Sequence, residues 1–195
     1  MSAGAQATPV TRAERERLMG HHALCVWLTG LSGAGKTTLA HATERLLHAA
    51  GMRTARVDGD ELRTSLCRDL GFSAADRAEN VRRAAAVARA LFESGAVVFV
   101  ALISPFAVAR AEARRMFPDG AFMEVHVSCP LDVCQLRDPK GLYAKAARGE
   151  ILDMTGVGSP YEAPTLPELV IDTSGVPIDA STAALERAIR ARIIG

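Results

Sequence analysis

One short stretch constrains the fold of this chain more than any other. Residues 30–37, with the sequence GLSGAGKT, match the pattern G-x-x-x-x-G-K-[ST] at every fixed position and lie between an apolar run and a helix-forming run. In the order strand, glycine-rich loop and helix, backbone N–H groups and a helix N-terminus can surround a phosphate chain. A glycine-rich turn that merely caps a helix is the alternative, and this order disfavours it.

The same pattern predicts roles for individual residues. Lys36 is expected to reach the β and γ phosphates of a nucleotide, and the hydroxyl of Thr37 to be a ligand of Mg²⁺. ATP and Mg²⁺ are therefore the expected cofactors. The expected contacts with the nucleotide are Gly30, Leu31, Ser32, Gly33, Ala34, Gly35, Lys36, Thr37 and Thr38.

Short apolar runs alternate with longer helical stretches along the rest of the 195-residue chain. This alternation is typical of a parallel sheet whose strands are joined by crossover helices. We predict a three-layer α/β fold of the P-loop NTPase type, in which helices cover both faces of a five-stranded parallel sheet. The expected strands are residues 24–29, 54–57, 96–103, 122–127 and 169–171, and the expected helices are residues 12–19, 36–50, 74–93, 107–116, a short one from 131, and 180–193.

The domain organisation is expected to be simple. Residues 1–11 are predicted to be disordered, and residues 12–195 to form a single domain, since this length suits one hydrophobic core. Residues 137–167 are too long and too rich in Gly and Pro for a plain connection. Long loops in small domains are usually functional, so we predict a mobile lid over a site.

Composition argues against several classes of protein. The chain has 23 Lys and Arg against 22 Asp and Glu, a formal net charge of +1. A nucleic-acid partner is not expected, because proteins that coat nucleic acid carry a surplus of cations. No apolar run approaches the roughly 20 residues that cross a bilayer, and the N-terminus lacks the apolar core of a signal peptide. We expect a cytoplasmic protein without a membrane partner, whose four cysteines are reduced thiols.

The sequence also lacks the features expected of a switch GTPase. The guanine-reading motif Asn-Lys-x-Asp cannot be present, because Asn80 is the only Asn in the chain. Residues 153–156 fit D-x-x-G, but they lie in the expected lid rather than after a strand. The size of the chain and the lid favour a small phosphotransferase.

Polar residues follow the second and third predicted strands. In a parallel sheet the ligand crevice lies beyond the carboxyl ends of the strands, so these residues are expected to face the phosphate loop. Asp60 is predicted to orient Mg²⁺ or to accept the proton of an attacking hydroxyl, and Arg63 to bind an anion. A helix N-cap by Asp58 or Asp60 is the alternative. Ser104 follows the third strand and is expected at the same crevice.

The helix predicted from residue 74 carries a second polar set. Arg77 and Asn80 are three residues apart and therefore share one helix face. A cation beside an amide suits a phosphate or sulfate with nearby ribose hydroxyls. A solvated charged face is the alternative.

Together these motifs resemble the adenylylsulfate kinase (APS kinase) family. The resemblance covers about residues 10–193, including segment 160–164, and rests above all on residues 137–143, Arg-Asp-Pro-Lys-Gly-Leu-Tyr. It implies transfer of the γ-phosphoryl group of Mg·ATP to the 3′-hydroxyl of adenosine 5′-phosphosulfate (APS), giving ADP and the sulfate donor PAPS for sulfate activation. The other matching motifs are residues 30–38, 58–60, 70–73, 76–77, 79–80 and 103–105.

The resemblance also implies roles for single residues. Lys140 would reach over both substrates, Arg137 would cover the ATP base, and Phe72 would stack on the APS adenine. The family's serine at position 104 has been assigned as a phosphoserine intermediate. Direct in-line transfer needs only Mg²⁺, a lysine and a proton acceptor, so we expect Ser104 to hold the ribose instead. The acceptor contacts implied by the family are Asp60, Arg63, Arg77, Asn80, Ile103 and Ser104. The catalytic candidates are Lys36, Asp60, Ser104 and Lys140. The candidate metal ligands are Thr37 and Asp60.

The chain departs from the family pattern at three places. Met154 replaces the usual Phe that would cover the second face of the APS adenine, and Ala107 and Glu61 replace an Arg and an Asn. A thioether recovers only part of an aromatic stacking energy. The sequence therefore leaves open a related P-loop kinase for another nucleotide or a secondary metabolite, and a nucleotide-binding module without activity.

Two further expectations concern partners and lysines. The resemblance implies a homodimer, and any ATP sulfurylase would be a separate chain, because no such domain fits this length.

The chain has 20 Arg and only three Lys. A compact ammonium suits a moving phosphoryl group, so Lys36 and Lys140 are expected to contact substrate and Lys145 to be solvated.

Overall fold

The structure, a computed structural model that describes residues 8–194, is built around one parallel sheet. All five strands are parallel and lie in the order β2-β3-β1-β4-β5, which confirms the predicted fold class. The strands are β1 (Leu24–Thr29), β2 (Thr54–Asp58), β3 (Val97–Ala101), β4 (Phe122–Ser128) and β5 (Leu169–Asp172). Eight helices occur in the described residues: α1 (Arg12–Met19), α2 (Lys36–Ala49), α3 (Gly59–Thr64), α4 (Ala74–Glu93), α5 (Ala107–Arg115), α6 (Leu131–Arg137), α7 (Leu142–Ala147) and α8 (Ile178–Ile193).

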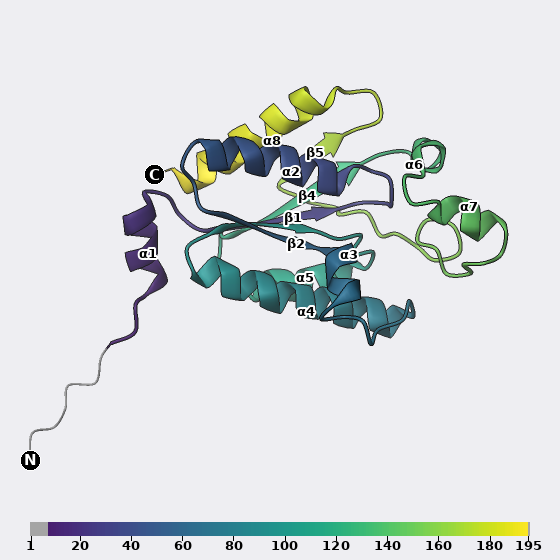
Figure 1. Ribbon diagram of the computed structural model, residues 1–195, viewed down its shortest axis with the longest axis horizontal. Coiled ribbons are helices and arrows are strands. Elements are labelled where there is room, and N and C mark those ends of the chain that lie inside the picture. The colour runs from purple at the N-terminus through teal and green to yellow at the C-terminus, as the bar shows by residue number, and fades with distance from the viewer. Residues whose placement is uncertain (1–7, 195) are drawn as a thin grey trace, which may run out of the picture.

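Helices cover both faces of the sheet, as Figure 1 shows. Helices α2 and α8 lie on one face, and α4 and α5 lie on the other. The central strand β1 is buried along its whole length. Because successive side chains of a strand point to opposite faces, Leu24, Val26 and Leu28 join one hydrophobic cluster, and Cys25 and Trp27 join the other.

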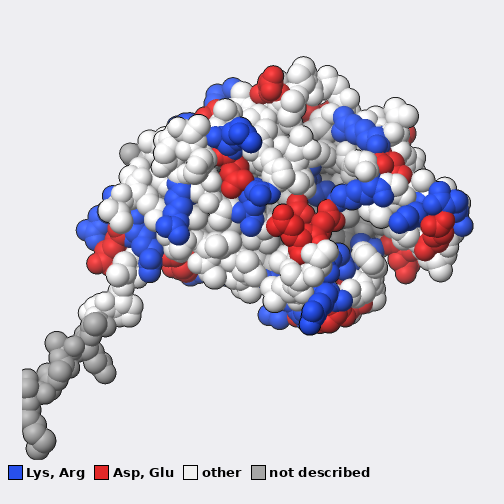
Figure 2. All heavy atoms as spheres, viewed as in Figure 1, with Lys and Arg blue, Asp and Glu red and all other residues white. Residues whose placement is uncertain are grey.

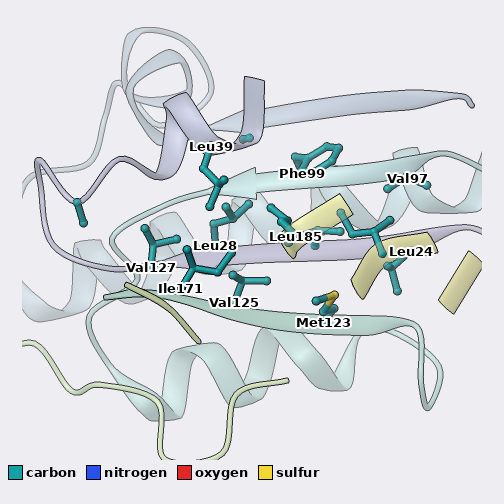
Figure 3. Close-up of a cluster of buried hydrophobic side chains, with 14 of the residues drawn as sticks. Leu24, Leu28, Leu39, Val97, Phe99, Met123, Val125, Val127, Ile171 and Leu185 are labelled. Carbon is teal, nitrogen blue, oxygen red and sulfur yellow. The ribbon is translucent and has the colours of Figure 1, made fainter. Parts of the chain in front are cut away.

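The cluster under α2 and α8 fixes the position of the strand that precedes the phosphate loop. Figure 3 shows Leu39 of α2 and Leu185 of α8 packed among side chains of the strands. Leu28, Leu39, Phe99 and Leu185 are fully buried. The packing holds the end of β1 and the start of α2 in one rigid arrangement, so the loop between them has fixed ends.

The strand order brings three polar loops to the same edge of the sheet. Leu28 of β1 pairs with Ala101 of β3, which in turn pairs with Asp58 of β2. The loops after these three strands therefore begin at one level, beyond their carboxyl ends. Ligands bind at this edge in open parallel sheets, so the fold itself places the candidate site.

Several element boundaries differ from the sequence predictions by one or two residues. β3 ends at Ala101, two residues before the predicted end, and Ser104 beyond it adopts a left-handed backbone conformation (φ 40°) ahead of Pro105. β2 continues to Asp58, whose carboxylate caps α3 by accepting from the N–H of Asp60. α8 begins at Ile178, two residues before the predicted start.

Helix α7 lies inside residues 137–167, the segment predicted to be a mobile lid. The carboxylate of Asp138 accepts hydrogen bonds from the N–H groups of Tyr143 (3.2 Å) and Ala144 (2.9 Å). These two bonds satisfy donors in the first turn of α7, which begins at Leu142. The segment is therefore more regular than its Gly and Pro content predicts.

At the N-terminal side, Thr11 forms the N-cap of α1 in a capping box with Glu14. Residues 1–7 of the segment predicted to be disordered lie outside the described residues. The four cysteines are buried free thiols. Within residues 8–194, no helix combines the length and the apolar character that crossing a membrane requires.

Candidate active site

A crevice of about 1180 Å³ opens beyond the carboxyl ends of β1, β2 and β3. Helices α6 and α7 lie at this end of the molecule, opposite α1 and the C-terminus (Figure 1). The crevice is lined by the loop after β1, by the start of α3, by the loop after β3 and by parts of residues 137–155. Basic and acidic side chains lie close together on the face shown in Figure 2.

The phosphate loop connects β1 to α2, as predicted. Gly30 has φ 156° and Gly33 has φ 78°, conformations that L side chains rarely adopt. A Cβ at Gly30 would lie 2.4 Å from the carbonyl oxygen of Val127, and one at Gly33 would lie 2.9 Å from that of Cys134. Glycine is therefore required at both positions, because of the backbone conformation and because the backbone of Val127 and of Cys134 approaches so closely.

Lys36 extends back along the loop that precedes it. Its ammonium donates to the carbonyls of Gly30 (2.9 Å) and Leu31 (2.8 Å), and its side chain is largely buried. Burial, together with the nearby charge of Lys140, lowers the pKa of Lys36 to about 8. The ammonium is thus held at the phosphate loop in an environment that favours loss of its proton.

Thr37 lies against Asp58. The Thr37 hydroxyl donates to Asp58 Oδ2 at 2.8 Å, while Oδ1 of the same carboxylate accepts from the N–H of Asp60. Asp58 is only 7% exposed, so its carboxylate is fixed by capping and by burial. A hydroxyl beside a buried carboxylate is a set of hard oxygen donors, which fits Mg²⁺.

Asp60, which was predicted to bind Mg²⁺, is placed differently. Its carboxylate forms an ion pair with Lys140, which comes from residues 137–143 on the other side of the crevice. Both side chains remain largely exposed, so the pair contributes little to stability. Asp60 and Lys140 are both site residues predicted from the sequence, whereas for Asp58 the sequence predicts only a possible helix cap. In the structure, Asp58 caps α3, and its carboxylate also accepts the hydrogen bond that the Thr37 hydroxyl donates.

Arg77 and Asn80 share a face of α4, as predicted, and both are buried. The guanidinium of Arg77 donates to the carbonyls of Phe72 (2.8 Å) and Asp153 and to the hydroxyl of Thr155 (2.6 Å). Arg77 therefore fastens residues 153–155 to the start of α4. The side-chain oxygen of Asn80 is buried without a hydrogen-bond partner among the described residues, and Asn80 lines the crevice.

Phe72 and Met154 both line the crevice but differ in exposure. The Phe72 ring is 59% exposed, and the guanidinium of Arg63 lies over it at 4.3 Å from the ring centroid. Met154 is 6% exposed and belongs to the hydrophobic cluster that also contains Tyr143. Phe72 is thus available for stacking, whereas Met154 is mostly packed into the protein.

Ser104 and Ile103 follow β3 and line the crevice, as predicted. Ser104 is only 2% exposed, and its hydroxyl accepts a hydrogen bond of 3.1 Å from the indole N–H of Trp27. Trp27 is a fully buried residue of β1. The Ser104 hydroxyl is therefore engaged by the core beneath the crevice.

Residues 137–143 are attached to the phosphate loop at two points. Arg137 donates to the carbonyl of Thr173 (2.6 Å) and that of Gly33 (3.4 Å). The hydroxyl of Tyr143 donates to the carbonyl of Ser32 at 3.0 Å, and burial raises the pKa of this phenol. Tyr143 ends the motif at residues 137–143, but the sequence alone predicts no role for it.

The sequence model of the adenylylsulphate kinase family matches residues 22–172. The chain belongs to the adenylylsulphate kinase family. An adenylyl-sulfate kinase from Shewanella oneidensis is 57% identical over 165 residues, which cover 85% of this chain and 80% of that protein. The APS kinase of Mycobacterium tuberculosis, solved in complex with AMPPNP and APS, has a TM-score of 0.83 at 45% identity, covering 87% of this chain and 98% of the solved one.

A third APS kinase, described as hexameric, comes from Thiobacillus denitrificans. It has a TM-score of 0.66 at 32% identity and covers 92% of this chain, but only 31% of that longer chain is matched. The family assignment from residues 137–143 and the phosphate loop is therefore confirmed, and so is the P-loop kinase fold. The roles of the individual site residues remain predictions.

Proposed function

We propose that this protein is an ATP-dependent adenylylsulfate kinase, which transfers the γ-phosphoryl group of ATP to the 3′-hydroxyl of APS and releases PAPS and ADP. One observation carries the proposal beyond family membership. The phosphate loop and the acceptor set of Arg63, Phe72 and Asn80 line one crevice, in which Asp60 and Lys140 are in contact. Phosphoryl transfer depends mainly on positioning and charge, and this arrangement supplies both.

The nucleotide side of the mechanism uses the phosphate loop. The N–H groups of residues 30–38 surround the phosphates, and Lys36 exchanges its two carbonyl partners for phosphate oxygens. Arg137, held beside the loop by Thr173, covers the base. Thr37 and Asp58 would hold Mg²⁺, which supplies neutralisation of phosphate charge when bound.

The acceptor side uses the opposite wall. Phe72 stacks on the adenine, and Asn80 uses its unpartnered buried oxygen to accept from a ribose hydroxyl. Arg63 binds the phosphosulfate, and Asp60 orients the 3′-hydroxyl and accepts its proton. Lys140 leaves Asp60 for the transferring phosphoryl group. Residues 137–167 act as the lid, which excludes water so that transfer outpaces hydrolysis.

A kinase for a different acceptor is the second candidate, because Met154 occupies the position of the usual aromatic residue. The decisive experiment measures ADP formation by the full chain with Mg·ATP, in the presence and absence of APS. Formation of PAPS that depends on APS is the expected result. ADP formation that does not respond to APS, or that responds only to another acceptor at equal concentration, would reject the assignment.

Further parts of the proposal concern the setting of the reaction. We place the enzyme in the cytoplasm, in sulfate assimilation, as a homodimer that receives APS from a separate ATP sulfurylase. Measurement of the molar mass in solution tests the dimer. A hexamer, as described for the Thiobacillus denitrificans relative, is the alternative assembly.

A further inference from the structure

The last part of the lid is tied to the loop that follows β3. We define the anchor as residues 160–164, and the acceptor loop as residues 102–106, which carry Ile103 and Ser104. The N–H of Glu162 in the anchor donates to the carbonyl of Pro105 in the acceptor loop at 2.9 Å. The two segments are far apart in sequence, so this contact joins the end of the lid to the acceptor wall of the crevice.

The side chain of Glu162 strengthens this connection. Its carboxylate accepts a hydrogen bond of 2.7 Å from the N–H of Ala107, the first residue of α5. The N-cap residue of α5, Phe106, offers no side-chain cap of its own. Glu162 thus supplies the missing cap from a distant segment and fixes the point where the acceptor loop enters the helix.

Arg110 of α5 binds both the anchor and the acceptor loop. Only 4% of its side chain is exposed, and it donates to the carbonyl of Ser104 (2.7 Å), the carbonyl of Glu162 (2.7 Å) and the carboxylate of Glu124 (2.7 Å). One planar guanidinium therefore binds the acceptor loop, the anchor and β4 together. Each acceptor is bound by a different nitrogen of the guanidinium, and the single nitrogen of a lysine does not offer this spread.

A third contact reaches the acceptor loop through Thr29. The hydroxyls of Tyr161 and Thr29 are hydrogen-bonded at 3.1 Å, and the Thr29 hydroxyl donates to the carbonyl of Ile103 at 2.7 Å. Thr29 is the last residue of β1, directly before the phosphate loop. The anchor is therefore attached to the acceptor loop at Ile103, Ser104 and Pro105 and at the helix that follows.

These contacts matter because the acceptor loop holds an unfavourable backbone conformation. Ser104 is one of two non-glycine residues with positive φ in the part of the chain that the structure describes. Such conformations persist only where the surroundings enforce them. Arg110 binds the carbonyl of Ser104, and Trp27 binds its hydroxyl, so the local shape depends on both partners.

We propose that Glu162 and Arg110 are positioning residues, which hold the acceptor loop in the shape that binds the acceptor and link that shape to the end of the lid. This inference rests on the proposed function. Neither residue lines the crevice, so each acts through the loop rather than by touching substrate. Their loss is expected to weaken acceptor binding while leaving the nucleotide side unchanged.

The test compares Glu162→Ala and Glu162→Gln with the wild-type chain. Glu162→Ala removes the cap of Ala107 and is expected to raise the KM for APS about tenfold, with the KM for ATP within about twofold of wild type. Glu162→Gln keeps an oxygen acceptor and is expected to restore most of the affinity. Arg110→Lys keeps the charge but loses the fork, and is expected to raise the KM for APS at least as much as Glu162→Ala.

The chain offers a matched control one helical turn away. Arg114 of α5 binds the carboxylate of Glu168 at 2.7 Å, and that carboxylate also accepts from the N–H of Glu124. Glu168 directly follows the lid, and its contacts do not include the acceptor loop. Glu168→Ala and Arg114→Lys are therefore expected to leave the KM for APS within about twofold of wild type, even if they lower the thermal midpoint by a similar amount.

Hydrogen exchange provides a readout that needs no substrate. Lower protection of the amides at positions 107 and 162 in Glu162→Ala than in Glu168→Ala, each relative to its intrinsic exchange rate, is the expected result. An unchanged KM for APS in active Glu162→Ala, or equal increases in Glu168→Ala, would overturn the proposal. If the wild-type chain does not phosphorylate APS, the proposed function fails by itself. Equal exchange in the two variants would then overturn the positioning role independently.

Discussion

Thr37 and Asp58 are joined by a hydrogen bond of 2.8 Å that connects the start of α2 to the end of β2. The other carboxylate oxygen of Asp58 caps α3, so one side chain links two helices and a strand at the nucleotide edge of the crevice. Asp60, two residues later, faces Lys140 instead. The acidic turn after β2 thus places one carboxylate beside the phosphate loop and the other beside Lys140, and we propose that the first serves the nucleotide and the second the acceptor.

Asp58→Asn is expected to weaken the use of Mg²⁺. The amide can still cap α3, because Asn and Asp are equally good N-caps, so the fold should be retained. The amide lacks the negative charge that a divalent cation requires, so kcat at 1 mM Mg²⁺ is expected to fall about 100-fold and to recover partly at higher Mg²⁺. Initial rates across a Mg²⁺ titration provide the measurement.

Asp60→Asn is the matched control for the metal role. Its kcat is expected to fall about 100-fold as well, because the proton acceptor is lost, but with an unchanged dependence on Mg²⁺. A Mg²⁺ dependence that shifts in Asp60→Asn and not in Asp58→Asn would reverse the two assignments.

Lys36 makes nucleotide binding sensitive to pH. Burial and Lys140 lower its pKa to about 8, and bound phosphates favour the charged ammonium, so binding raises this pKa again. ATP is therefore expected to bring up to one proton onto the protein at and above pH 8, and none below about pH 7. The apparent affinity should fall by up to tenfold per pH unit above 8.

Calorimetry in buffers of different ionisation enthalpy measures this proton uptake. Lys140→Gln removes the neighbouring positive charge, so the pKa of Lys36 should rise and the break in affinity should move to higher pH. Lys36→Arg carries a charge that does not titrate in this range and should show no uptake. Uptake that persists in Lys36→Arg would assign the proton to another group.

Much of the fold could be predicted because its signals are local. The strands β1 and β3 are buried throughout and almost wholly apolar, since helices cover both of their faces. Gly51 and Gly95 follow α2 and α4 with positive φ, as expected of residues that end helices. The phosphate loop required only a short pattern in its correct context. These features depend on neighbours within a few residues.

The site was less predictable where it depends on distant partners. Arg77 was placed on the correct helix face, but its bonds to Asp153 and Thr155 join residues more than 70 positions apart, for which the sequence has no signal. Asp58 was considered a cap, and its second contact, to Thr37, follows only from the strand order. Tyr143 could have been found, because it ends the most specific motif in the chain.

Phe72→Ala tests the acceptor wall. Stacking of a base on an aromatic ring contributes about 1–3 kcal/mol, so the KM for APS is expected to rise about tenfold or more. The ring is 59% exposed, and its loss should therefore change the thermal midpoint little. Steady-state kinetics with each substrate varied in turn provide the measurement, and Phe72→Tyr, which keeps the ring, is the control. A rise in the KM for ATP instead would place the ring on the nucleotide side.

Ser104→Ala tests whether the reaction passes through a phosphorylated serine. The Ser104 hydroxyl is buried and accepts from the indole of Trp27, so it is poorly placed to attack a phosphoryl group. We expect Ser104→Ala to retain kcat within about tenfold of wild type, because transfer is in line from ATP to the acceptor. The variant should be less stable by about 1–3 kcal/mol, since the buried indole N–H loses its partner. Both quantities are measured below the thermal midpoint of the variant, by product formation and by denaturant unfolding.

Incubation of wild type with labelled ATP should leave no label on the protein. A labelled Ser104 that passes its phosphoryl group to APS at the rate of turnover would contradict direct transfer.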